Sequence, residues 1–129
     1  DMPMNHKIFL AQFDAIKKLA SEGPCVMVGR CADYALSEYK DCFSVFVHAD
    51  TDWRINRLSQ KHNKTAKEAK DMINKTDKSR SSYYNYYTNK KWGAASSYNL
   101  CVDSSKLGID GAAKAIIQAI EIFDSIKNK

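Results

Sequence analysis

The hydrophobic and polar positions of the chain separate into helical stretches and short continuous apolar runs. Over residues 6–22 apolar side chains recur every three or four positions, from Phe9 to Leu19, as on one face of an amphipathic helix. Gly23 and Pro24 follow directly and are typical of a helix C-terminus. The pattern therefore predicts an N-terminal helix over 6–22.

Three short apolar runs, at 25–28, 43–47 and 98–102, predict buried strands. A short helix over 31–37 fits between the first two runs, whose separation of about fifteen residues suits a parallel crossover. A right-handed crossover of this kind brings the carboxyl ends of both strands to the same edge of a sheet.

Start signals indicate three further helices. Thr51-Asp52 is expected to cap the first of them. Thr65 and Glu68 have the spacing of a capping box and are expected to begin the second. Asp110 precedes a long closing helix. The residues expected to face inward from that helix are Ala113, Ile116, Ile120 and Phe123.

The order of helices and strands predicts one α/β domain, spanning residues 1–129, around a parallel sheet. A chain of 129 residues is long enough for one domain with a core, and no linker or internal repeat divides it. Three strands are few for such a sheet. We therefore expect further strands to be missing, or to be supplied by a partner, which leaves a homo-oligomer open.

Composition narrows the class of protein. The 44% hydrophobic and 27% charged contents are typical of a soluble globular protein. No apolar run approaches the roughly 18 residues that span a bilayer, and residues 7–20 do not resemble a signal peptide, so we expect a cytoplasmic protein with no membrane partner. The four cysteines form no C-x-x-C pair and the three histidines no H-x-x-x-H pattern, so free thiols are expected and no metal site.

Positive charge gathers in one segment. Residues 61–91 hold eight lysines and Arg80 against three carboxylates, so the excess there is larger than the +5 of the whole chain. From 75 to 87 the cations are interleaved with tyrosines. Cations this dense face water or a polyanion. This segment has three possible roles. From composition alone, the first is an exposed helix whose tyrosines pack on the domain or on another subunit, and the second is a lid over transferring phosphates. An RNA-binding surface ranks last.

The segment after the first predicted strand is a candidate ligand site. Gly29 allows the backbone to turn closely past a ligand, and Arg30 follows it at the strand's carboxyl end, where ligands bind in α/β sheets. An ordinary strand end with a surface arginine fits these residues equally well.

Four motifs together resemble the bacterial cytidylate kinase-like family, in its order and spacing. They are VGRCADY at 28–34, KTDKSRSSYY at 75–84, KWG at 91–93 and YNLCVDS at 98–104. The resemblance covers the chain from Phe9 to Ile120. It implies a three-layer α/β/α parallel sheet of the P-loop nucleoside monophosphate kinase type, with residues 65–92 as a lid-like helical insertion.

The resemblance also implies an activity and its residues. ATP, with Mg²⁺, would donate a phosphoryl group to a nucleoside monophosphate such as CMP. The lid group Lys75, Lys78 and Arg80 would neutralise the transferring phosphoryl group while Asp77 orients them. The residues matched to the acceptor are Arg30, Asp33 and Tyr34, and those matched to the ATP side are Arg54 and Arg57.

The sequence lacks one feature of the family and differs from true cytidylate kinases in two others. No glycine-rich G-x-x-x-x-G-K-[ST] loop occurs, although the fold uses its amides to cradle phosphates. True cytidylate kinases have Gly-Arg-Asp where this chain has Gly29-Arg30-Cys31, and their lids hold more arginines. We therefore expect the C-terminal portion of such a protein, incomplete at its N-terminus, with magnesium ligands elsewhere and no kinase activity of its own.

Two other functions compete with this interpretation. One is a non-catalytic binding or assembly protein whose basic helix contacts RNA or an acidic partner. The other is a kinase of the same fold with a non-nucleotide acceptor, because no residue clearly reads a base.

Overall fold

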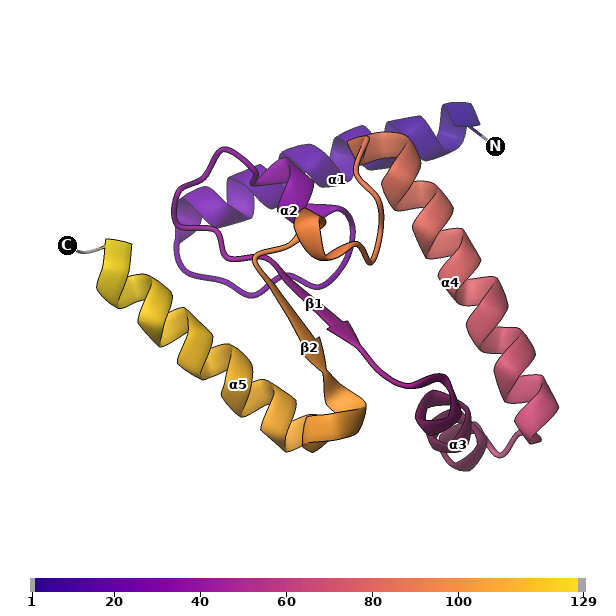
Figure 1. Ribbon diagram of the computed structural model, residues 1–129. Coiled ribbons are helices and arrows are strands. Elements are labelled where there is room, and N and C mark those ends of the chain that lie inside the picture. Colours follow the sequence, from indigo (N-terminus) through magenta and orange to yellow (C-terminus); the bar gives the residue numbers. More distant parts are fainter. Residues whose placement is uncertain (1, 128–129) are drawn as a thin grey trace. The chain divides into compact units, whose positions relative to one another are not determined.

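The computed structural model describes residues 2–127, and Figure 1 shows how its elements follow one another. The chain divides into two compact units, one ending at Phe43 and the other beginning at Ser44. The elements are α1 (Met2–Glu22), α2 (Ala32–Ala35), β1 (Val45–His48), α3 (Thr51–His62), α4 (Ala66–Thr88), the 3₁₀ turn η1 (Ala95–Ser97), β2 (Leu100–Asp103) and α5 (Ser104–Lys127).

The first unit is built on α1 and α2. Its core packs Ile16 of α1 against buried apolar side chains of residues 32–36. Phe13 lies edge-on to the ring of Tyr34, with ring centroids 6.2 Å apart. Both helices that the sequence predicts in this unit are therefore confirmed.

The strand predicted at 25–28 is absent, and this prediction is wrong. Residues 25–28 have no regular secondary structure, and the side chains of Val26 and Val28 are 93% and 89% exposed. Met27, between them, packs against the core of the first unit. The side chains alternate as in a strand, but a strand forms only by pairing, and the one sheet among residues 2–127 joins β1 to β2.

The second unit contains that sheet. β1 and β2 pair in parallel, from Val45 opposite Leu100 to His48 opposite Asp103. α5 packs on both strands, and α3 packs on α4. In Figure 1, α4 and α5 lie to either side of the strands. The predicted strands at 43–47 and 98–102 are thus present, each shifted toward its carboxyl end.

The observed fold is a mixed α/β structure that is mostly helical, with a two-stranded parallel sheet. The three-layer sheet expected from the sequence is not formed by residues 2–127. The parallel pairing is correctly predicted, whereas the size of the sheet is not, because one of the three expected strands stays unpaired.

The helix starts follow local side-chain hydrogen bonds. Asp50, rather than Thr51-Asp52, caps α3, because its carboxylate accepts a hydrogen bond from the Trp53 N–H at 3.4 Å. The capping box of α4 is confirmed. The Glu68 N–H donates to Thr65 Oγ1 at 3.1 Å, and the Thr65 N–H donates to Glu68 Oε1 at 2.9 Å.

The last helix begins earlier than predicted. α5 starts at Ser104 and contains a break at Gly108, whose φ of 75° and ψ of 170° are not helical. Of the side chains expected to face inward, Ala113 and Ile120 are exposed. Ile116 and Phe123 are half-buried, and Ala112 is buried instead of Ala113. No helix within residues 2–127 has the length and apolar character needed to cross a membrane.

Candidate functional site

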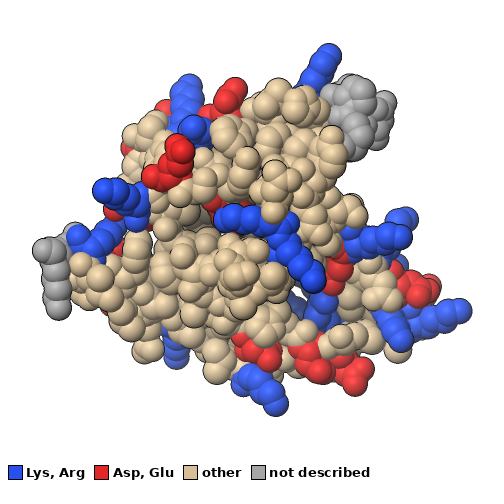
Figure 2. All heavy atoms as spheres, turned by 45° about the horizontal axis from the view of Figure 1, so that its top comes forward, with Lys and Arg blue, Asp and Glu red and all other residues tan. Residues whose placement is uncertain are grey.

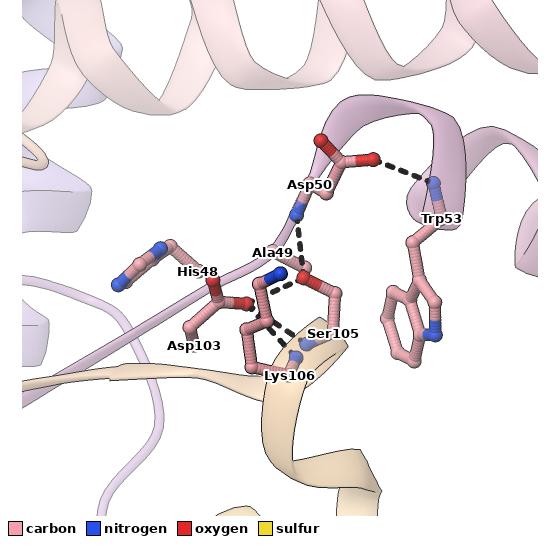
Figure 3. A pocket seen from close by; sticks show the side chains of 7 residues that line it. All are labelled: His48, Ala49, Asp50, Trp53, Asp103, Ser105 and Lys106. Carbon is pink, nitrogen blue, oxygen red and sulfur yellow. Dashed lines mark hydrogen bonds between the residues drawn. The ribbon is translucent and has the colours of Figure 1, made fainter.

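A pocket of about 410 Å³ opens at the carboxyl ends of the two parallel strands (Figure 3). Its walls come from the segment that joins β1 to α3 and from the segment that joins β2 to α5. The lining residues are His48, Ala49, Asp50, Trp53, Asp103, Ser105 and Lys106. They combine an indole face, two carboxylates, an imidazole and an amine in one recess.

Hydrogen bonds tie the two walls together. The Asp50 N–H donates to Ser105 Oγ at 2.9 Å, and this hydroxyl donates to Asp103 Oδ1 at 2.5 Å (Figure 3). Asp103 Oδ1 also accepts the backbone N–H groups of Ser105, at 2.9 Å, and Lys106, at 3.3 Å. Ser105 therefore links two loops that lie 55 residues apart in the sequence.

These bonds hold Asp103 ionised. The hydrogen bond from the Ser105 hydroxyl lowers the pKa of Asp103 below its usual value. The two backbone N–H groups and the nearby His48 act in the same direction and outweigh the opposing effect of burial. His48 lies opposite Asp103 in the strand register. The pocket thus presents a fixed carboxylate beside an imidazole.

A second cluster joins α3 to α4. Arg54 makes a two-point contact with the Asp77 carboxylate, with Nη1 2.8 Å from Oδ2 and Nη2 3.0 Å from Oδ1. Arg80 Nη2 approaches Asp77 Oδ1 at 2.5 Å from one helical turn further along α4. The side chains of Arg54 and Asp77 are 29% and 23% exposed, so the pair is partly shielded from solvent. One carboxylate therefore holds two guanidinium groups in place.

The charge state of Asp77 follows from this contact. Burial alone would raise its pKa, but the hydrogen bonds and positive charges of Arg54 and Arg80 outweigh it and lower the pKa below the usual value. The cluster of two arginines and one carboxylate keeps a net positive charge that could meet an anion.

Aromatic side chains fix the outer end of this cluster. The guanidinium of Arg80 lies over the ring of Trp92, with its Cζ 5.2 Å from the ring centroid. The Trp92 ring meets Phe46 of β1 edge-on at 5.2 Å, and Phe46 stacks on Tyr98 at 4.8 Å. The cluster is thus connected to the sheet.

The structure brings only some of the predicted ATP-side and lid residues together. Arg54, Asp77 and Arg80 share one cluster. Arg57 lies over the ring of Trp53 instead, with Cζ 5.7 Å from the centroid. The side chains of Lys75 and Lys78 are exposed on α4, and Figure 2 shows many Lys and Arg side chains projecting into solvent among Asp and Glu.

The residues matched to the acceptor lie in the first unit. Arg30 is exposed, in a turn where Gly29, Arg30 and Cys31 have φ values of 71°, 59° and 56°. The left-handed conformation is strained for Arg30 and Cys31, which are not glycines. Asp33 and Tyr34 belong to α2, and both side chains are half-buried. The turn holds the Arg30 side chain outward in solvent.

The motifs in the sequence do not identify the residues that line the pocket. His48, Asp50 and Asp103 each stand at or next to the carboxyl end of a strand, which is the signal that would have found them. Among the described residues, no group of three His, Cys, Asp or Glu side chains is arranged to hold a metal ion. These residues therefore do not supply a complete Mg²⁺ site.

The fold and the pocket define an α/β protein with a polar pocket at the carboxyl ends of two parallel strands. The chain belongs to the cytidylate kinase-like family, whose family model matches residues 1–106. This membership relates the chain to kinases at the level of the family and leaves its substrate open.

A solved structure of an uncharacterized protein from Eubacterium ventriosum is similar to this chain. The two are 34% identical, with a TM-score of 0.85 over 88% of this chain. The match covers 65% of the other chain, so this chain spans about two thirds of that protein's length. No protein among those with curated functions matches.

Proposed function

We propose that this chain is the lid-bearing part of an ATP-dependent phosphotransferase that acts on a nucleoside monophosphate, with a CMP-like acceptor. One observation carries the proposal. Trp53 of the pocket and Arg54 of the cation cluster are neighbours on α3, immediately beyond the carboxyl end of β1. Consecutive residues of one helix thus supply an aromatic ring to the pocket and a guanidinium group to the cation cluster, and these are the kinds of group that bind the base and the phosphates of a nucleotide.

The pocket has the chemistry to accept the base and ribose of a nucleotide. The indole of Trp53 offers a stacking surface. The carboxylates of Asp50 and Asp103 accept hydrogen bonds from amino and hydroxyl groups, and Lys106 donates them. A volume of about 410 Å³ lies within the range of small-molecule sites.

The cluster of Arg54, Asp77 and Arg80 would serve the phosphates. Phosphoryl transfer depends mainly on positioning and on neutralising charge, and planar guanidinium groups bind phosphate oxygens at two points. Asp77 holds Arg54 and Arg80 at fixed positions before a ligand arrives, which reduces the cost of ordering them. Lys75 and Lys78 would add diffuse positive charge from the exposed side of α4.

Arg30 would hold the acceptor phosphate. Its exposure and the strained turn that presents it support this role. ATP, when bound, would supply the phosphoryl group. Groups outside residues 2–127 would hold Mg²⁺, because the described residues do not gather a ligand set for it.

The sequence has no glycine-rich phosphate loop, and we expect the 129-residue chain alone to bind nucleotide without turning it over. The test has two parts. An ADP-release assay across nucleoside monophosphates is run on the product of the complete open reading frame that contains this chain. Turnover that is highest with CMP is expected, and no turnover with any nucleoside monophosphate would refute the nucleotide assignment.

The second part is calorimetric titration of the 129-residue chain with ATP. Arg54→Gln is expected to weaken binding roughly tenfold or more, because it removes a charged hydrogen-bonding group. Lys61→Gln is the matched control, since Lys61 is exposed in the last turn of the same helix. A salt-dependent shift with RNA that ATP and CMP leave unchanged would instead favour the binding-protein alternative.

A further inference from the structure

Arg80 is held from two directions. Its Nη2 pairs with Asp77 Oδ1, and its guanidinium carbon Cζ lies over the ring of Trp92, 5.2 Å from the centroid. A cation at this distance from an indole face is attracted by the ring quadrupole. The side chain of Arg80 is nevertheless 55% exposed, so a ligand in solution can reach it.

Trp92 is itself anchored at both its backbone and its ring. Its backbone N–H donates to Asn85 Oδ1 on α4 at 2.7 Å. Its ring meets Phe46 of β1 at 5.2 Å and an interplanar angle of 89°. The next residue, Gly93, donates its N–H to the hydroxyl of Tyr98 at 3.1 Å, and the Tyr98 ring stacks on Phe46. The loop that bears Trp92 is therefore tied to both the basic helix and the sheet.

This arrangement matters because arginine is long and flexible. An unrestrained guanidinium loses rotamer freedom when it binds a phosphate, whereas one already stacked on a fixed ring has lost part of that freedom beforehand. Trp92 contacts the guanidinium group of Arg80 through its ring, a contact that uses none of the arginine's N–H donors. Those donors are the groups that bind phosphate oxygens.

We propose that Trp92 is a positioning residue that orients Arg80 toward a polyphosphate, through contacts that run from Arg80 to the ring of Trp92 and from there, edge-on, to Phe46 of β1. The proposal rests on the proposed function, because it assigns phosphate as the ligand of Arg80. The proposal assigns a role to Trp92, which lies outside the cation cluster. It also means that Phe46 of β1 supports Arg80 of α4 through the ring of Trp92.

The test is a double-mutant cycle on the 129-residue chain, read by calorimetric titration with inorganic tripolyphosphate. Trp92→Leu is expected to weaken binding roughly two- to fivefold, the size of an exposed to partly exposed cation–π contact. Trp92→Phe keeps an aromatic face and is expected to restore most of the affinity. In an Arg80→Gln background, Trp92→Leu should cause no further loss.

Lys78 provides the control, because it is exposed on the same helix. The losses caused by Lys78→Gln and Trp92→Leu should simply add. Far-UV circular dichroism and thermal melts of each variant establish that it folds. A loss from Trp92→Leu that persists in full without Arg80 would show that Trp92 acts only on the fold, and would overturn the proposal.

The same experiment separates this inference from the proposed function. A wild-type chain that binds no tripolyphosphate refutes the phosphate role of the cluster. The same double-mutant cycle is then measured by urea denaturation. A coupling free energy of unfolding between Arg80 and Trp92 would support the contact that positions Arg80, and the absence of any coupling would refute that contact as well. Binding without any coupling overturns the role of Trp92 alone.

Discussion

Replacing Asp77 by asparagine tests the centre of the cation cluster. The substitution keeps the shape of the side chain but removes the charge that holds Arg54 and Arg80. Hydrogen bonds to charged groups contribute about 1.5–3 kcal/mol when shielded, and exposed ion pairs under about 1 kcal/mol. With Asp77 23% and Arg54 29% exposed, we expect the free energy of unfolding to fall by about 1–2 kcal/mol.

The pH dependence of stability gives the prediction a second measure. The pKa of Asp77 is lower in the folded chain than its ordinary value of 3.8, so the folded state favours the ionised carboxylate. The contribution of Asp77 to the free energy of unfolding is complete above pH 3.8. It is lost as the pH falls from there through the lower pKa that Asp77 has in the folded state. Asp77→Asn should therefore flatten the fall in stability over this acidic range.

Urea denaturation followed by circular dichroism, repeated from neutral pH into the acidic range, measures both effects. Asp71→Asn is the matched control, because it removes the same charge from an exposed position on the same helix. We expect it to change the unfolding free energy by less than about 0.5 kcal/mol. Equal losses from the two variants, or an unchanged acid profile in Asp77→Asn, would refute the shielded contact.

Three other substitutions or reactions test parts of the fold. Thr65→Ala should lower the free energy of unfolding by about 1 kcal/mol, since it breaks the capping box of α4, whereas Thr65→Ser should keep it; urea denaturation distinguishes the two. Gly93→Ala should cost about 1–2 kcal/mol in the same measurement, because φ there is +81° and an added Cβ meets only ordinary contacts, so an unchanged stability would contradict the strain. Cys25, which is exposed, should be alkylated by iodoacetamide at pH 8 well before Cys31. Burial, and to a smaller extent the charge of Asp33, raises the pKa of the Cys31 thiol to about 11. Equal labelling of the two cysteines in peptide mass spectrometry would contradict this order.

Features set by neighbouring residues could be predicted from the sequence. The start of α4 is one, because Thr65 and Glu68 satisfy each other's backbone N–H groups within a single turn. The sequence predicts the start of α3 one or two residues late, because Asp50, Thr51 and Asp52 can all cap a helix. Only the backbone conformation decides which of them does.

The pocket could not be predicted in the same way. It depends on the register that sets His48 opposite Asp103, and on the contact of Asp50 with Ser105 across 55 residues. The apolar runs indicate that two strands exist, but not how they are aligned. The sequence likewise names Arg54 and Asp77 separately, whereas their contact appears only once α3 packs on α4.

The turn at Gly29 and Arg30 shows how much a strand depends on its partner. The sequence of residues 25–28 is a good strand sequence, and its side chains do alternate between solvent and the core of the first unit. Backbone groups in a strand are satisfied by a neighbour, and local propensity cannot replace that neighbour. The exposed Val26 and Val28 are therefore the residues that a further strand would cover. An upstream segment that pairs there should bury both valines and protect their amides from hydrogen exchange. Amides that exchange at the same rate in this chain and in a longer product of its open reading frame that contains such a segment would rule that pairing out.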